Sequence, residues 1–274
     1  MKLRKAPALE GFQWAKSGAL ILHRQPLAHV ALLLAMSMTL GLLASLPWIG
    51  PVAALVLLPS VSAGWVFSSA TVLAGVRTTP GRLIAPLASP RRNALLQLGV
   101  LHMLACVTVL WVADLLDPSF RAALGPALGS QDGVTEEATM QALDQVRSGM
   151  LMRGIMLLPV ALVFWHAPVI LHRIGGGVAR ALFASALATW RNLPAFGVYG
   201  LSWLVADVIL SSVVGLIAAA IGQPQIVLLL VLPAAVMFAS AFYASLHASV
   251  HACIEFDEVA RAQQDAAAPD EPAP

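Results

Sequence analysis

A stretch of 52 residues between Arg24 and Arg77 contains no Asp, Glu, Lys or Arg. As one continuous helix it would be about 78 Å long, whereas the hydrocarbon core of a bilayer is about 30 Å thick. The stretch therefore predicts two membrane-spanning helices. The sequence Pro47-Trp48-Ile49-Gly50-Pro51 supplies the turn between them.

Further charge-poor stretches complete the count of spans. The last long stretch, 192–254, has Asp207 as its only charge and divides at Gly222-Gln223-Pro224. We expect an all-α polytopic membrane protein with a single six-span domain over 1–254, an external loop at 117–150 and a disordered cytoplasmic tail at 255–274. Within the external loop, Thr135 can cap a helix that could run directly into the fourth span. The six spans are expected at about 27–47, 51–76, 93–116, 151–171, 195–221 and 225–251.

The composition agrees with a membrane protein and excludes other classes. Hydrophobic residues make up 59% of the chain and charged residues 11%, whereas soluble domains are about 25% charged. These values exclude a soluble enzyme, a nucleic-acid-binding domain and a disordered chain. The net charge of +2 gives no phosphate-seeking surface, and two cysteines cannot form a disulfide framework.

The distribution of basic residues predicts the orientation. In the six-span topology, 13 of the 16 Lys and Arg residues fall on one side and the other three, Arg121, Arg147 and Arg153, fall opposite. Short cytoplasmic loops are enriched in Lys and Arg. Both termini are therefore expected in the cytoplasm. The first apolar stretch continues into a second span, so it is not expected to be a cleaved signal peptide.

The even-numbered spans share a local pattern that predicts an internal repeat. A Leu-Pro pair ends each of the segments 57–59, 157–159 and 231–233. Amphipathic segments at about 12–24 and 180–191 precede the first and fifth spans, and a short proline-broken segment, 80–93, precedes the third. We expect three hairpin repeats with two or three interfacial helices on the cytoplasmic side.

Asp207 is the sharpest candidate for a functional residue, because a charge near the centre of a span is costly. It shares a helical stripe with Ser211, which predicts that it faces the bundle and not lipid. The carboxylate could be a proton or cation site, or it could join two helices by a hydrogen bond. The stripe consists of Gly200, Asp207, Ser211 and Gly215.

Two weaker patterns lie toward the cytoplasmic side. His247 and His251 are four residues apart and could hold a metal with His166, His172 or Cys253, although histidine rings are also common at membrane interfaces. No metal or other cofactor is therefore expected. A glycine run before a helix can bind a phosphate or act as a hinge. The candidate lipid-headgroup contact consists of Arg173, Gly175, Gly176, Gly177 and Arg180.

Several polar and aromatic segments carry a family resemblance. They are Gly11-Phe12-Gln13-Trp14 through His23-Arg24-Gln25-Pro26, Phe164-Trp165-His166-Ala167-Pro168, Trp190-Arg191-Asn192 and Tyr199-Gly200-Leu201. Over roughly residues 10–254 the chain resembles an uncharacterised family of bacterial six-span inner-membrane proteins built from interfacial helices and hairpins. The resemblance implies a topology and an inner-membrane address, and it implies no catalytic residues.

The absence of a catalytic motif favours a non-enzymatic scaffold or accessory protein. Its expected partners are membrane lipid and another membrane protein or a second copy of itself, and neither nucleic acid nor nucleotide is expected. The alternative is a small-solute or proton-coupled transporter that uses Asp207. An intramembrane enzyme would need paired ionisable groups at one depth, and the sequence predicts only one mid-membrane acid.

Overall fold

The computed structural model describes residues 1–128, 135–222 and 224–256 of the chain. Within these ranges, six helical segments are long and apolar enough to cross a membrane. The protein is therefore an all-α polytopic membrane protein, as the sequence predicts.

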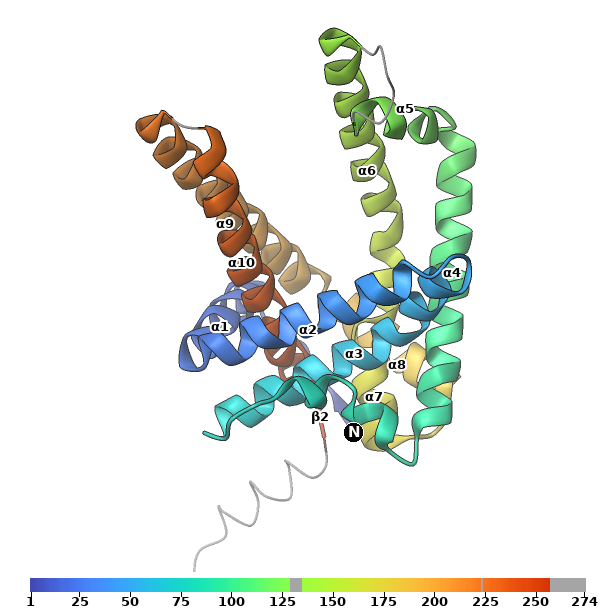
Figure 1. Ribbon diagram of the computed structural model, residues 1–274. Coiled ribbons are helices and arrows are strands. Elements are labelled where there is room, and N and C mark those ends of the chain that lie inside the picture. The colour runs from blue at the N-terminus through green and yellow to red at the C-terminus, as the bar shows by residue number, and fades with distance from the viewer. Residues whose placement is uncertain (129–134, 223, 257–274) are drawn as a thin grey trace, which may run out of the picture.

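The long helices form three consecutive hairpins. Figure 1 shows the second and third hairpins pointing upward and apart from each other, while the first lies across the lower half of the view. The predicted spans overlap these helices, with ends that differ by a few residues except in the fourth. The hairpins are α2 (Pro26–Ala44) with α3 (Ile49–Leu73), α4 (Arg92–Leu116) with α6 (Glu136–Phe164), and α9 (Leu193–Ile221) with α10 (Pro224–Cys253).

A proline lies inside the second helix of each hairpin. Pro59 is within α3, Pro159 within α6 and Pro233 within α10. The Leu-Pro pairs thus occupy corresponding elements, although common ancestry of the three hairpins remains a prediction. The fourth span also contains a break, because α6 ends at Phe164 and α7 (Ala167–Ile174) begins with a proline in its first turn, where the missing amide is tolerated.

The segment 117–150, predicted to be an external loop, contains one short helix and the first part of a long one. Ser119–Ala127 form α5, and α6 begins at Glu136 and runs directly into the fourth span. Thr135 caps α6, because its hydroxyl oxygen accepts a hydrogen bond from the Ala138 amide at 3.3 Å. Residues 129–134 of this segment lie outside the described part.

The amphipathic segments form α1 (Glu10–Arg24) and α8 (Val178–Arg191), and the segment 80–93 begins with two short 3-10 turns, η1 (Pro80–Leu83) and η2 (Ala85–Ala88). Small residues of α8 face the protein, whereas Phe183 and Trp190 are 71% and 74% exposed. Exposed aromatic side chains are typical of a helix at a membrane interface. The interfacial position of these helices remains a prediction.

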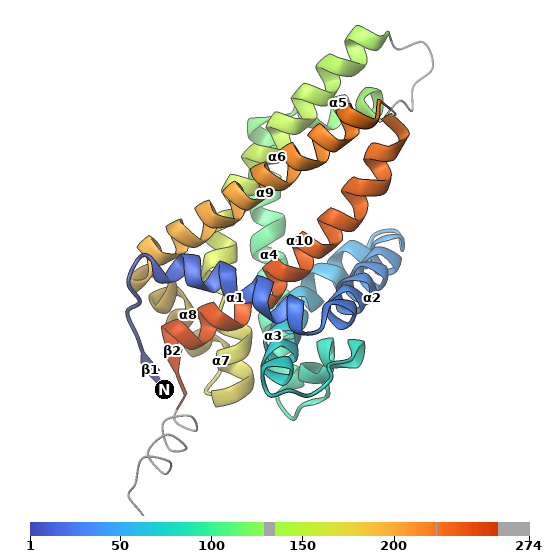
Figure 2. The ribbon, with the colours of Figure 1, turned by 90° about the vertical axis from the view of Figure 1, so that its left-hand side faces the viewer.

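The main hydrophobic core lies where α1, α7 and α8 meet the lower parts of α9 and α10 (Figure 2). Trp14 of α1 is 2% exposed and packs edge-on against Phe196, with 5.3 Å between ring centroids. Gly11 and Gly18 allow close helix contact, since a Cβ at Gly18 would lie 2.3 Å from the Ala241 carbonyl oxygen. The core thus holds the hairpins together at one end.

The two ends of the described chain pair with each other. β1 (Lys2–Leu3) is antiparallel to β2 (Ile254–Glu255), and Phe256 is buried. The prediction of disorder is therefore wrong for residues 255 and 256, and the remaining residues of the predicted tail, 257–274, lie outside the described part. Such two-residue strands carry no periodic pattern by which the sequence could reveal them.

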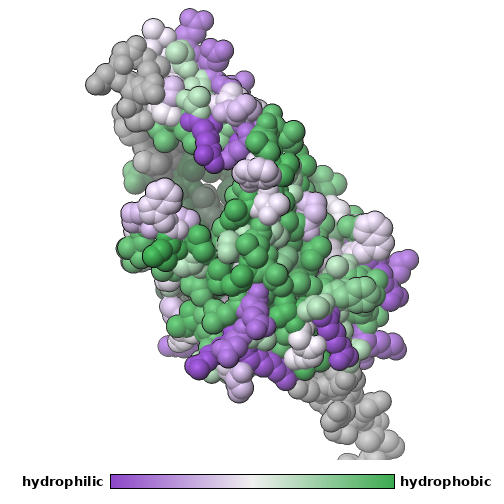
Figure 3. Space-filling view, turned by 90° about the vertical axis from the view of Figure 1, so that its right-hand side faces the viewer, coloured by the Kyte–Doolittle hydropathy of each residue, from purple (hydrophilic) through white to green (hydrophobic). Residues whose placement is uncertain are grey.

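The face of the molecule seen in Figure 3 has the layered polarity of a membrane protein. Figure 3 shows a broad hydrophobic band across the middle of the molecule, with hydrophilic residues gathered toward its two ends. A hydrocarbon core requires such a band, because it contains no water to solvate polar side chains.

Candidate functional site

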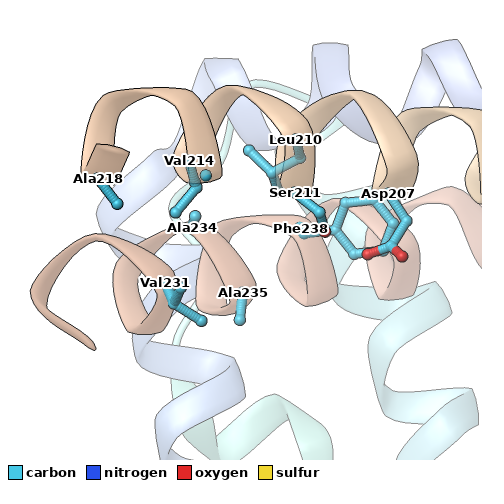
Figure 4. A pocket seen from close by; sticks show the side chains of 10 residues that line it. Asp207, Leu210, Ser211, Val214, Ala218, Val231, Ala234, Ala235 and Phe238 are labelled. Carbon is cyan, nitrogen blue, oxygen red and sulfur yellow. The ribbon is translucent and has the colours of Figure 1, made fainter. Parts of the chain in front are cut away.

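The third hairpin carries a groove that contains the predicted intramembrane acid. Asp207, Ser211 and Gly215 of α9 line it together with Phe238 of α10. Figure 4 shows the Asp207 carboxylate beside the Phe238 ring, between the ribbons of the two helices. The groove has a volume of about 510 Å³ and a mostly apolar lining, contributed by α9 and α10 alone.

Asp207 faces α10 but is not enclosed by the bundle. Its side chain is exposed, and it forms no hydrogen bond or ion pair with another described residue. Asp207 and Ser211 therefore face α10, as the stripe predicts. The Asp207 side chain is nevertheless exposed and not buried within the bundle. The reason is that, within the described residues, no third helix lines the groove over this part of the hairpin.

α9 differs from the other spans in how little of it is covered. Of its most apolar 18 residues, 6% are buried within the chain, against 22–44% in the other five spans. Large apolar side chains along it, such as Leu204 and Leu216, are 60% and 71% exposed. This hairpin therefore presents a long apolar surface with one carboxylate in it.

The glycine run has the backbone geometry of a loop that only glycine adopts easily. Gly175, Gly176 and Gly177 have φ values of +77°, +81° and +89°, directly before α8. The Arg180 side chain lies close to Gly176, and Arg91 from the loop before α4 lies close to Gly175. The Arg91 guanidinium also donates to the His172 carbonyl, so this arginine lies beside the glycine run, a proximity that sequence spacing could not predict.

Arg173, the remaining member of that candidate set, has other contacts. Its guanidinium carbon lies 4.8 Å from the centroid of the Phe256 ring and 5.8 Å from that of Phe67. These cation–π contacts connect α7 to α3 and to the residue after β2. Lipid binding at this loop remains a prediction.

Within the described residues, the candidate metal-binding histidines lie in separate contacts. The His247 and His251 rings are in contact, with 4.3 Å between ring centroids and a tilt of 46° between their planes, but His166 packs against Phe196 and His172 against Phe67. Within residues 1–128, 135–222 and 224–256, no three His, Cys, Asp or Glu side chains come together as metal ligands would. The hypothesis that His166, His172 or Cys253 completes a site with this pair is therefore wrong for the described residues.

A charged cluster that sequence reasoning missed lies at the far end of the second hairpin. The Arg153 guanidinium of α6 donates to Asp114 Oδ1 at 2.7 Å and to Asp117 Oδ2 at 3.1 Å. It also lies 3.7 Å from the centroid of the Phe120 ring, and Arg121 forms a second ion pair with Asp114. This cluster could have been predicted from the opposite charges of Asp114 and Arg153, which lie at the facing ends of two consecutive spans.

This cluster has a structural role in the geometry observed. Arg153 is 7% exposed and contacts the end of α4, the following turn, α5 and its own helix. A buried guanidinium is tolerated when its donors are satisfied in this way. The four charged residues, Asp114, Asp117, Arg121 and Arg153, form ion pairs with one another.

Comparison with known proteins supplies one relative of almost equal length. The chain is 28% identical over 266 residues to a Burkholderia thailandensis protein named "Probable inner membrane protein", and the match covers 94% of this chain and 96% of the relative. The chain is similar to a bacterial inner-membrane protein. The relative's name fits the resemblance to an uncharacterised bacterial membrane-protein family and indicates no molecular activity. No family model and no solved structure matches the chain.

Proposed function

We propose that the protein is a non-enzymatic scaffold or accessory protein of the bacterial inner membrane. Its third hairpin binds a transmembrane helix of another membrane protein, and both of its termini are cytoplasmic. The observation that carries this proposal is the exposure of α9, of which 6% of the most apolar 18 residues are buried within the chain.

The position of Asp207 indicates the chemistry of the partner helix. A lone carboxylate facing hydrocarbon costs about 2.5–3.5 kcal/mol or more, so an ionised Asp207 favours a partner that supplies a cation or a hydrogen-bond donor. The groove around it is apolar, and Gly215 and Ala218 leave room for a close helix approach. We therefore infer a partner helix with a Lys, an Arg or a hydroxyl group at the depth of Asp207.

The geometry gives less support to a transporter. A transport site is expected between repeats, where rocking of one repeat against another would open it to either side. The groove at Asp207 is instead lined by two consecutive helices of one hairpin. This arrangement suits docking better than alternating access.

A photo-crosslinking amino acid at Ser211 tests the proposal in native membranes. Ser211 lines the groove, whereas Ile209, 58% exposed and absent from the groove lining, serves as the matched control. We expect Ser211 to yield one discrete protein adduct, and Ile209 to yield mainly lipid adducts. Sequencing of the adduct should identify a helix with a basic or hydroxyl residue at the crosslinked depth.

Asp207→Leu adds the specific control. The Ser211 adduct should disappear in this variant, while Asp207→Glu should retain it. Lipid adducts alone at Ser211, or an adduct unaffected by Asp207→Leu, would contradict the proposal. An adduct between two copies of the chain would replace the heterologous partner by a homo-oligomer.

A further inference from the structure

A second cavity lies at the opposite end of the molecule from the hairpin tips, between the N-terminal residues, α1 and the end of α10. We call it the arm pocket. It has a volume of about 410 Å³, and its lining is rich in polar side chains, unlike the groove at Asp207. The polar and aromatic side chains that line it are Arg4, Lys5, Glu10, Gln13, Trp14 and His251.

The N-terminal arm, residues 1–9, is held firmly beside this pocket. The Arg4 amide donates to the Cys253 carbonyl at 2.9 Å, next to the β1–β2 pair. Asn192, fully buried, accepts from the Ala6 amide at 2.7 Å and donates to the Arg4 carbonyl at 3.0 Å. The backbone from which the Arg4 and Lys5 side chains project is therefore fixed at the edge of the pocket.

The charges around the pocket are not neutralised within the described chain. Arg4, Lys5 and Glu10 form no ion pair with another described residue. Trp14, which also lines the pocket, has a buried indole Nε1 without a hydrogen-bond partner in the described part. The pocket therefore offers two cations together with one carboxylate.

This combination matches a zwitterion with an anionic and a cationic end. Guanidinium and ammonium groups bind phosphate oxygens, and the first turn of α1 adds a favourable dipole for an anion. A carboxylate such as Glu10 binds a primary ammonium by charge-assisted hydrogen bonds. A purely anionic group would use the cations but would be repelled by Glu10.

The surroundings of the pocket indicate a lipid as the source of this group. Leu9 and Phe12, at the start of α1, are 77% and 52% exposed, which suits contact with acyl chains. His251 and Ala252 lie in the last turn of α10, where the sixth span ends. The pocket therefore lies at the boundary between hydrocarbon and water, where lipid headgroups are found.

We propose that the arm pocket binds the phosphoethanolamine headgroup of a membrane lipid. Arg4 and Lys5 hold the phosphate, and Glu10 accepts hydrogen bonds from the primary ammonium. The site is separate from the groove at Asp207, and the two can be tested independently.

Native mass spectrometry of the delipidated full-length protein tests this site with defined lipids. We expect phosphatidylethanolamine to bind about tenfold more tightly than phosphatidylglycerol, which lacks the ammonium, and than phosphatidylcholine, whose trimethylammonium cannot donate. O-phosphoethanolamine tests the soluble source and should bind more weakly than the lipid. Equal binding of the three lipids would overturn the proposal, and equal binding of the soluble compound would overturn the lipid assignment.

Substitutions separate the two ends of the headgroup. Glu10→Gln should remove the preference for phosphatidylethanolamine while binding of phosphatidylglycerol is kept, and the double variant Arg4→Gln, Lys5→Gln should weaken all three lipids. Lys2→Gln is the matched control, because Lys2 is exposed on the same arm and does not line the pocket. An equal loss in Lys2→Gln, or an unchanged preference in Glu10→Gln, would contradict the assignment.

Discussion

Arg153 is the residue on which the tip of the second hairpin depends most. Its guanidinium bonds to two carboxylates at once and stacks on Phe120. A lysine ammonium cannot reproduce this planar geometry. We expect Arg153→Lys to lower the melting temperature in detergent by several degrees, whereas Arg147→Lys, the same change at an exposed position of α6, should leave it within a degree or so. Equal melting of the two variants would contradict the role given to Arg153.

Asp117 makes the stability of the same tip depend on pH. The Ser119 hydroxyl and then the Arg153 guanidinium hold the pKa of Asp117 below its usual value of 3.8. A carboxyl with a lowered pKa stabilises the fold above its unfolded pKa, and this stabilisation is lost as the pH falls through the folded value. Asp117→Asn should therefore melt below the wild type at neutral pH, and the difference should shrink below about pH 4. A difference that stays constant down to pH 3 would contradict this role.

At the scale of elements, contact between α1 and the third hairpin requires the absence of a side chain at Gly18. A Cβ there would lie 2.3 Å from the Ala241 carbonyl oxygen and 2.6 Å from the Ser245 Cβ. We expect Gly18→Leu to lower the free energy of unfolding by about 1–3 kcal/mol or more, measured by denaturant titration in detergent micelles. Gly41→Ala in α2 is the control, because no atom lies within 4 Å of its added Cβ. If Gly18→Leu were as stable as Gly41→Ala, this account of the packing would be contradicted.

Sequence patterns predict the helices of this chain but not all of the contacts between them. Charge-free stretches predict six spans because a hydrocarbon core excludes charge from any helix that crosses it. The patterns cannot predict which distant residues meet, and so the Arg153–Asp114 pair, 39 residues apart, was missed. The exposure of Asp207 was also missed, because a helical stripe indicates a direction and not whether another helix covers it.

At the scale of the whole molecule, the distribution of basic residues predicts the orientation, which can be measured directly. The two native cysteines are buried, so a single introduced cysteine reports its own side of the membrane. Lys16→Cys on α1 should react with a membrane-impermeant maleimide only after permeabilisation of spheroplasts, and Gln141→Cys on α6 should react before it. The reverse pattern would place the termini outside the cytoplasm.

The central claim is that the exposed third hairpin binds a helix of a partner protein. The most direct test is to release the protein from native membranes and measure the mass of the complex that contains it. We predict that the wild-type protein and Asp207→Glu are each released in a complex with a second membrane protein at a fixed ratio. Asp207→Leu should be released without that partner but remain folded, as shown by an unchanged melting temperature. A wild-type particle that contains one chain and lipid alone, or a partner retained by Asp207→Leu, would contradict the claim that Asp207 and its groove bind a partner helix.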